Sequence, residues 1–185
     1  MNKVRAIFCL LLLTLLSACG GGSEGTGVYT TGLTKTLRIS ELSNSQVESA
    51  CSAYTKFFTK FFSDPSSCYI DGLAETRTIS SSNQAQNQCE IIVQECSLDL
   101  DLNDTLKDLN PCDLQSLETR NCNATVAQYE ACVNERSAKL GDLLDSLSCQ
   151  EAGNQQYYNT QIEDFFGEAI FSGPSCREFV NTCNF

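Results

Sequence analysis

The 185-residue sequence predicts an all-α fold, in which two duplicated, disulfide-stapled helical modules pack into one small domain. Two observations predict this fold. Apolar residues recur every three or four positions in two long stretches, which is the pattern of amphipathic helices. The spacings between cysteines also occur twice along the chain, which indicates that one stapled unit has been duplicated.

The first long stretch covers about residues 44–63. Its apolar stripe comprises Val47, Ala50, Cys51, Tyr54, Phe57, Phe58, Phe61 and Phe62. Ser43, Asn44 and Ser45 are candidate N-caps, and the Asp64-Pro65 pair predicts the end of the helix. A shorter helix is expected at about 83–97. Residues 68–82 between the two are polar and are expected to form a loop or a short extended piece.

The second long stretch begins after Asn123, which is a plausible N-cap. Its apolar stripe comprises Val126, Tyr129, Val133, Leu140, Leu143, Leu144 and Leu147. Helical spacing returns within 150–175, and Gly173-Pro174 predicts an interruption before the last two cysteines.

The cysteine spacings carry the evidence for duplication. Cys51 to Cys68 and Cys132 to Cys149 are both 17 positions apart, and Cys89 to Cys96 and Cys176 to Cys183 are both seven. We therefore predict helical module 1 at 40–97, a connector at 98–121 and helical module 2 at 122–185. Each module could bury only a modest core alone, so disulfides would contribute much of the stability.

A disulfide pairing follows if helix 44–63 lies antiparallel to helix 83–97. The start of one helix then faces the end of the other, and the same logic applies to the second module. The predicted pairs are Cys51–Cys96, Cys68–Cys89, Cys132–Cys183 and Cys149–Cys176, with Cys112–Cys122 across the connector. Ten cysteines allow hundreds of other connectivities, so this set is a hypothesis.

The N-terminus has the three parts of an export signal. Lys3 and Arg5 precede an apolar run at 6–16, which is too short to span a bilayer, and Leu16-Ser17-Ala18-Cys19 follows. These four residues resemble the lipobox of bacterial lipoproteins. The resemblance implies that signal peptide 1–18 is removed and that Cys19 carries a diacylglycerol thioether, usually with a further acyl chain such as palmitate. The alternative is an ordinary signal peptide with an accidental cysteine.

Residues 19–39 are rich in Gly, Thr and Ser, so we expect a lipidated, flexible tether. The residue after Cys19 is Gly20 rather than Asp. By resemblance to enterobacterial sorting, this favours the outer membrane, with the body facing the periplasm or the cell surface.

The body has its own resemblance. The lipobox, the spaced cysteines and a V-x-x-Y-E-x-C-V type segment from Val126 to Val133 resemble the Cys-rich helical lipoproteins of myxobacteria and their relatives. The likeness covers a loose cysteine pattern over about 110–183. Because that group has no assigned activity or defined catalytic motif, it implies a fold and an envelope location but no site residue.

Composition excludes several classes of function. The net charge is −11, which disfavours nucleic acid and anionic headgroups as partners. The chain has no His, which argues against His-dependent triads and most transition-metal sites. It also has no C-x-x-C pair, so we expect no metal, no cofactor and no catalytic residue.

Three local patterns could each be either a functional site or an ordinary structural feature. Asp99-x-Asp101-x-Asn103 begins like a calcium loop, but Gly and Glu are missing from the positions that complete one, so we expect a solvated connector. The phenylalanines at 57–62 predict helix core rather than a binding groove. Glu163-Asp164 is a carboxylate pair of the kind expected by chance among 23 acidic residues.

The sequence therefore predicts a membrane-anchored envelope lipoprotein that acts as a non-enzymatic binding or structural module. Its expected partners are the bilayer, through acylated Cys19, and an unknown envelope protein or ligand. The alternatives are a cell-envelope hydrolase that uses carboxylates and an accessory subunit of an envelope assembly complex.

Overall fold

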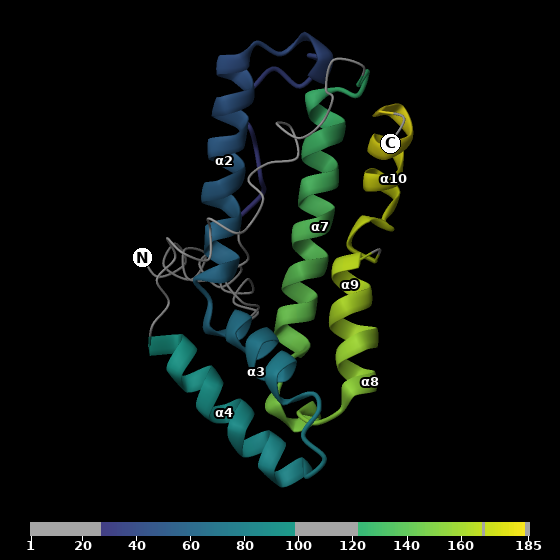
Figure 1. Ribbon diagram of the computed structural model, residues 1–185. Coiled ribbons are helices and arrows are strands. Elements are labelled where there is room, and N and C mark those ends of the chain that lie inside the picture. Colours follow the sequence, from purple (N-terminus) through teal and green to yellow (C-terminus); the bar gives the residue numbers. More distant parts are fainter. Residues whose placement is uncertain (1–26, 99–121, 168, 184–185) are drawn as a thin grey trace, which may run out of the picture.

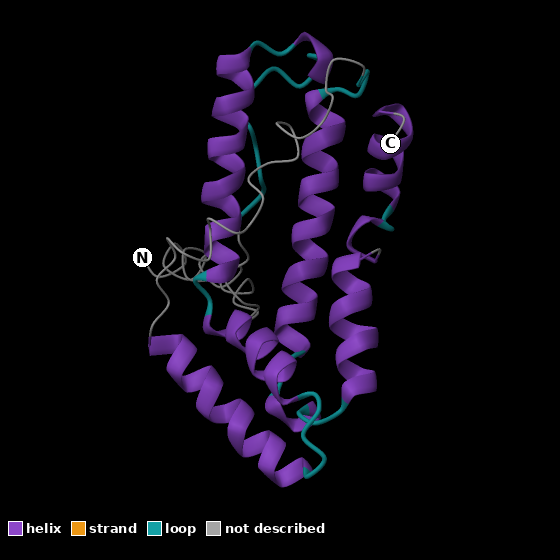
Figure 2. Cartoon of the chain, viewed as in Figure 1, coloured by secondary structure: helices purple, strands orange, loops and turns teal. Residues whose placement is uncertain are grey.

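A computed structural model describes residues 27–98, 122–167 and 169–183, and this part of the chain is all-helical (Figure 2). The prediction of an all-α fold is confirmed. The main helices are α2 (Asn44–Phe62), α3 (Cys68–Thr76), α4 (Ser82–Leu98), α7 (Val126–Ser146) and α10 (Pro174–Cys183). Short turns of helix connect them, namely η1 (Ile39–Glu41), η2 (Pro65–Ser67), η4 (Cys149–Glu151), α8 (Gln155–Tyr158), the π-turn η5 (Asn159–Glu163), α9 (Asp164–Gly167) and η6 (Ala169–Phe171).

The two longest helices run in the same direction (Figure 1). Helices α2 and α7 both descend in that view, α8 to α10 return along α7, and α3 and α4 lie across the lower end. Backbone pairing between 35–40 and 122–127 fixes the upper ends, with Ile39 N–H donating to Ala124 O at 2.9 Å. The core comprises inward faces from both predicted modules, so the modules pack on each other.

Capping boxes set the starts of the two long helices. Ser43 Oγ accepts from the Gln46 N–H, and the Gln46 side chain accepts from the Ser43 N–H. Thr125 and Gln128 repeat this arrangement at the start of α7. The expectation of a cap near Ser43 is confirmed. The choice of Asn123 is wrong, because residues 122–125 are still extended and paired with the N-terminal segment.

Residues 68–76 form a helix, so the expected loop is wrong. Helix α3 buries Cys68, Gly72, Leu73 and Thr76, which share one helical face. The sequence does not show an apolar stripe here because two of these four buried residues are Gly and Thr. Thr76 is fully buried and donates its hydroxyl proton to Gly72 O at 2.6 Å, which removes the cost of burying it.

The disulfides differ from every predicted pair. The structure bonds Cys68 to Cys96, Cys89 to Cys149, Cys122 to Cys183 and Cys132 to Cys176. Cys51 is disulfide-bonded as well. The predicted pairs Cys51–Cys96, Cys68–Cys89, Cys112–Cys122, Cys132–Cys183 and Cys149–Cys176 are therefore wrong.

The physical reason for this error is helix α3. Helix α4 packs mainly on α3 rather than on α2, so the antiparallel partner of Cys96 is Cys68 at the start of α3. Cys89 is then left to reach η4 in the second module. The spacing of cysteines repeats, but the connectivity does not. Cys132 bonds Cys176 within module 2, whereas Cys89, which corresponds to Cys176 in the proposed repeat, bonds across the modules.

Residues 27–39 belong to the folded body, so the predicted tether over 19–39 is wrong in this part. Tyr29 is 2% exposed and Ile39 is also 2% exposed. Tyr29, Thr31 and Ile39 are buried and Leu33 and Leu37 are half-buried, while most of the residues between them are exposed. The backbone bends at 32–33 and turns at 35–36, so the segment is irregular rather than a continuous strand. The Gly- and Thr-rich composition concealed this burial. We call residues 28–39 the N-terminal strap, and it runs between α2 and α7 (Figure 1).

Candidate functional site

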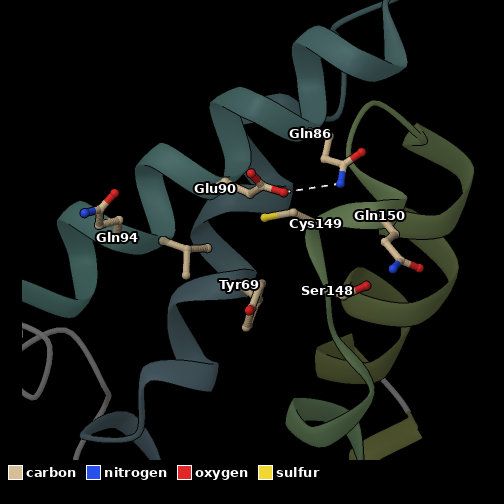
Figure 3. Close-up of a pocket in the computed structure, with 8 residues that line it drawn as sticks. Tyr69, Gln86, Glu90, Gln94, Ser148, Cys149 and Gln150 are labelled. Atoms are coloured by element: carbon tan, nitrogen blue, oxygen red, sulfur yellow. Dashed lines mark hydrogen bonds between the residues drawn. The ribbon is translucent and has the colours of Figure 1, made fainter.

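A polar cleft of about 330 Å³ opens where α3, α4 and the η4 turn meet (Figure 3). Its size lies at the lower end of the range for small-molecule sites. It is lined by Tyr69, Gln86, Glu90, Val93, Gln94, Ser148, Cys149 and Gln150. Amides and hydroxyls dominate this lining, and Glu90 is the one charged side chain among these residues.

Helix α4 supplies one wall of the cleft. Gln86, Glu90 and Gln94 are four residues apart and therefore share a helical face. The Gln86 amide donates to Glu90 Oε1 at 3.2 Å. This contact orders an amide and a carboxylate side by side, and Figure 3 shows both on the side of α4 that faces Cys149.

The opposite wall comes from Ser148, Cys149 and Gln150. The disulfide from Cys149 to Cys89 joins this wall to α4, and both cysteines are buried. Gly153 then turns the chain with φ +80°, and a Cβ there would lie 2.7 Å from Ile79 O. Only glycine fits this turn without strain, so Gly153 fixes the η4 wall against the α3–α4 loop.

Close packing of α3 on α4 completes the cleft, with Tyr69 projecting from α3. A Cβ on Gly72 would lie 2.9 Å from Cys89 Sγ and 3.2 Å from Cys89 O. The absence of a side chain at Gly72 therefore sets the distance between the two helices. Sequence reasoning missed the cleft because its walls come from both predicted modules, and the Cys89–Cys149 bond that joins them was not foreseen.

A second polar cluster surrounds Glu130, which is 3% exposed on α7. Its Oε1 accepts from Thr31 N–H and Thr31 Oγ1, both at 2.8 Å, and its Oε2 forms an ion pair with Lys35. A buried carboxylate is stable only when it is paired and hydrogen-bonded, as here. All of these partners belong to the N-terminal strap, so the cluster fastens the strap to α7.

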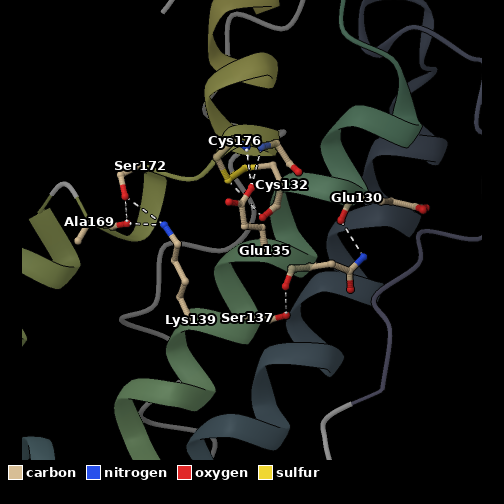
Figure 4. Close-up of a disulfide and its surroundings, with 10 residues drawn as sticks. Glu130, Cys132, Glu135, Ser137, Lys139, Ala169, Ser172 and Cys176 are labelled. Carbon is tan, nitrogen blue, oxygen red and sulfur yellow. Dashed lines mark hydrogen bonds between the residues drawn. A yellow bond between two sulfur atoms is a disulfide. The ribbon is translucent and has the colours of Figure 1, made fainter.

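A third group surrounds the Cys132–Cys176 disulfide (Figure 4). Glu135 Oε2 accepts from the backbone N–H of Ser175 at 2.7 Å and of Cys176 at 3.3 Å. These donors lie in the first turn of α10, where a negative charge is favoured. Lys139 Nζ donates to Ala169 O at 2.9 Å and Ser172 Oγ at 3.1 Å. The group holds α10 and η6 onto α7 and leaves no open site.

The sites predicted from sequence have mixed outcomes. Cys19 and the Asp99–Asn103 pattern lie outside the described residues. Phe57, Phe58 and Phe61 are buried and contact one another through edge-on and tilted rings, so the expectation of helix core is confirmed. Glu163 and Asp164 are exposed and do not line the cleft.

Searches for relatives returned no family model, no curated protein and no solved structure that matches this chain. Within residues 27–98, 122–167 and 169–183, no group of three or more His, Cys, Asp or Glu is placed to hold a metal ion. No helix in the same residues is long and apolar enough to cross a bilayer.

Proposed function

We propose that this protein is a membrane-anchored envelope lipoprotein whose disulfide-stapled body is a non-enzymatic binding module. One observation carries the proposal: an open cleft lined by amides and hydroxyls whose walls are joined by the Cys89–Cys149 disulfide. Walls that a disulfide holds in place favour binding because little backbone entropy is lost when a ligand arrives.

Oxidised cysteines support export. The chain holds Cys68–Cys96, Cys89–Cys149, Cys122–Cys183 and Cys132–Cys176 as disulfides. Stable structural disulfides are typical of exported proteins and rare in the reducing cytosol. The lipobox-like sequence from Leu16 to Cys19 also supports export. Acyl chains on Cys19 would supply a stable membrane anchor.

The strap limits how far the body can stand from the membrane. Tyr29 is already buried between α2 and α7, and it follows Cys19 by ten residues. Ten residues span at most about 35 Å when fully extended. A lipid on Cys19 would therefore keep Tyr29 within about 35 Å of the headgroups, and we expect the ligand to be found in the envelope near the membrane.

The cleft favours binding over hydrolysis. Glycosidases and related hydrolases use two carboxylates on either side of the bond they cleave. Glu90 is the one carboxylate among the described residues that line the cleft, and its Oε1 accepts a hydrogen bond from Gln86. A second acid to pair with it is missing from this lining.

The test compares the full chain with a Cys19→Ser variant, both expressed with their leader in a Gram-negative host. We expect the parent protein in the membrane fraction and the variant in the periplasm. Equal distribution of both would contradict the lipid anchor.

Crosslinking in intact membranes then tests binding. A captured envelope component that is recovered unaltered supports a binding module, and turnover that is abolished by Glu90→Gln without loss of folding contradicts it.

A further inference from the structure

We propose that the cleft between α3, α4 and η4 binds an uncharged saccharide. This inference deepens the proposed function, since it names the ligand class of the same site. It starts from charge. Glu90 is the one ionisable carboxylate among the described lining residues, no cation lies in that lining, and the chain carries a net charge of −11. Phosphates and carboxylates are therefore repelled, which leaves uncharged and cationic ligands.

The hydrogen-bonding groups of the cleft suit hydroxyl groups. Each of the glutamines Gln86, Gln94 and Gln150 offers both donors and acceptors, and Ser148 and Tyr69 add hydroxyls that do both. A ligand that satisfies such a lining must carry many groups that donate and accept in turn. Neighbouring hydroxyls of a sugar ring do this, whereas a cationic ammonium group only donates.

The ordered pair of Gln86 and Glu90 sharpens this match. Their hydrogen bond of 3.2 Å uses one proton of the Gln86 amide and leaves its carbonyl as an acceptor. The carboxylate beside it has a second oxygen that can accept from a hydroxyl. Two acceptors next to an amide donor fit two adjacent hydroxyls of one sugar ring.

The cleft also provides an apolar surface for the C–H face of a sugar. Val93 lies between Glu90 and Gln94 on the same helix, and Tyr69 presents its ring from α3. Both side chains are partly buried and pack against the core, so they form a fixed floor. Small-molecule sites commonly combine such a floor with a few placed polar groups.

The walls of the cleft are held in place before any ligand binds. Cys89–Cys149 ties α4 to η4, Cys68–Cys96 ties α3 to α4, and Gly72 lets the two helices meet closely. Glu90, Gln94 and Gln150 are exposed side chains, and it is the backbone that carries them that these bonds hold in place. A preformed site loses less entropy, so we expect a measurable dissociation constant of about 1 mM or below.

The test is saturation-transfer NMR and calorimetry on the full chain carrying Cys19→Ser, with all cysteines oxidised. The probes are N,N′-diacetylchitobiose, cellobiose and maltose, with spermidine and inorganic phosphate as charged comparisons. We expect at least one of the three sugars to bind and the two charged probes not to bind. Failure of all three sugars to bind, or tighter binding of either charged probe, would overturn the inference.

Two variants locate the site. Gln86→Leu with Gln150→Leu removes an amide from each wall and should weaken sugar binding at least about tenfold. Gln88→Leu, on the exposed side of α4 and outside the cleft, is the matched control and should bind like the parent. Circular dichroism verifies that both fold. Unchanged binding in the double variant would contradict the assignment, and a lipidated protein that ignores every sugar would leave the proposed function intact.

Discussion

Asn134 binds the backbone of Tyr29 through both ends of its amide. Its Oδ1 accepts from the Tyr29 N–H at 2.7 Å, and its Nδ2 donates to Tyr29 O at 3.1 Å. The Tyr29 hydroxyl donates to Ala50 O at 3.2 Å, and its ring packs on Phe57. Asn134 belongs to α7 and Ala50 to α2, so one strap residue joins the two longest helices.

Removing the Tyr29 side chain should therefore destabilise the whole body. We expect Tyr29→Ala to lower the free energy of unfolding by about 3–5 kcal/mol, as for other large core aromatics. Val28→Ala is the control because Val28 is 85% exposed, and its effect should stay within about 0.5 kcal/mol. Urea unfolding followed by circular dichroism measures both. Equal stability of the two variants would show that the strap is not part of the core.

Tyr29 should also make stability fall at alkaline pH. Desolvation by burial raises the pKa of its hydroxyl from 10.0 to about 12. The folded state thus keeps the proton that the unfolded chain loses near pH 10. Stability is fully present below pH 10 and is lost as pH rises toward 12, by up to roughly 3 kcal/mol. Unfolding measured from pH 8 to 12 should show a shallower loss in Tyr29→Phe, and identical slopes would argue against burial of this hydroxyl.

Glu130 should matter far more than an exposed glutamate. Glu130→Gln removes the charge that pairs with Lys35 and that accepts two hydrogen bonds from Thr31. We expect a loss of about 2–3 kcal/mol in unfolding free energy. Glu178→Gln is the matched control, since Glu178 contacts Gln128 at the exposed surface, and it should cost under about 1 kcal/mol. Comparable losses of unfolding free energy in the two variants would show that Glu130 does not hold the N-terminal strap on α7.

Two glycines in helices should respond to alanine in opposite directions. A Cβ at Gly72 would meet Cys89 Sγ at 2.9 Å, so Gly72→Ala should cost about 1–3 kcal/mol by overpacking. A Cβ at Gly141 would lie 3.8 Å from Phe61, an ordinary contact, so Gly141→Ala should gain up to about 1 kcal/mol from helix propensity. Thermal unfolding distinguishes them. Stabilisation by Gly72→Ala would show that α3 and α4 are not in close contact.

Besides the crosslink that Cys51 makes, non-reducing proteolysis of the oxidised protein should give four crosslinked peptides. These peptides join Cys68 to Cys96, Cys89 to Cys149, Cys122 to Cys183 and Cys132 to Cys176. Each bond closes a loop of 28 to 61 residues and contributes about 3–4 kcal/mol in the chain-entropy model. Recovery of Cys68–Cys89 or Cys149–Cys176 by mass spectrometry would instead support the pairing inferred from sequence.

Long amphipathic helices could be predicted from the sequence, and long-range pairing could not. Apolar spacing and the Ser43 cap located α2, because both are local properties of the chain. Helix α3 was not predicted because its buried face includes Gly72 and Thr76, which do not count as apolar residues in a sequence pattern. Without α3, the sequence analysis gave Cys96 the wrong partner. It therefore also missed the Cys89–Cys149 bond and the cleft beside it.

The strap was missed for a related reason. Its composition predicts a tether, while the structure buries Tyr29, Thr31 and Ile39. Packing of this irregular segment on the helices depends on partners about a hundred residues away, such as Glu130 and Asn134. A single sequence carries no local signal for contacts of that range.

Export with lipid attachment is the claim on which the proposed function depends most, and an intact-mass measurement tests it directly. The full chain would be produced in a Gram-negative host and purified from membranes without reductant. We expect a polypeptide that starts at Cys19, carries a diacylglyceryl group with or without a further acyl chain, and has ten fewer hydrogens than its fully reduced form. A product that still starts at Met1, with no lipid mass and free thiols, would contradict it.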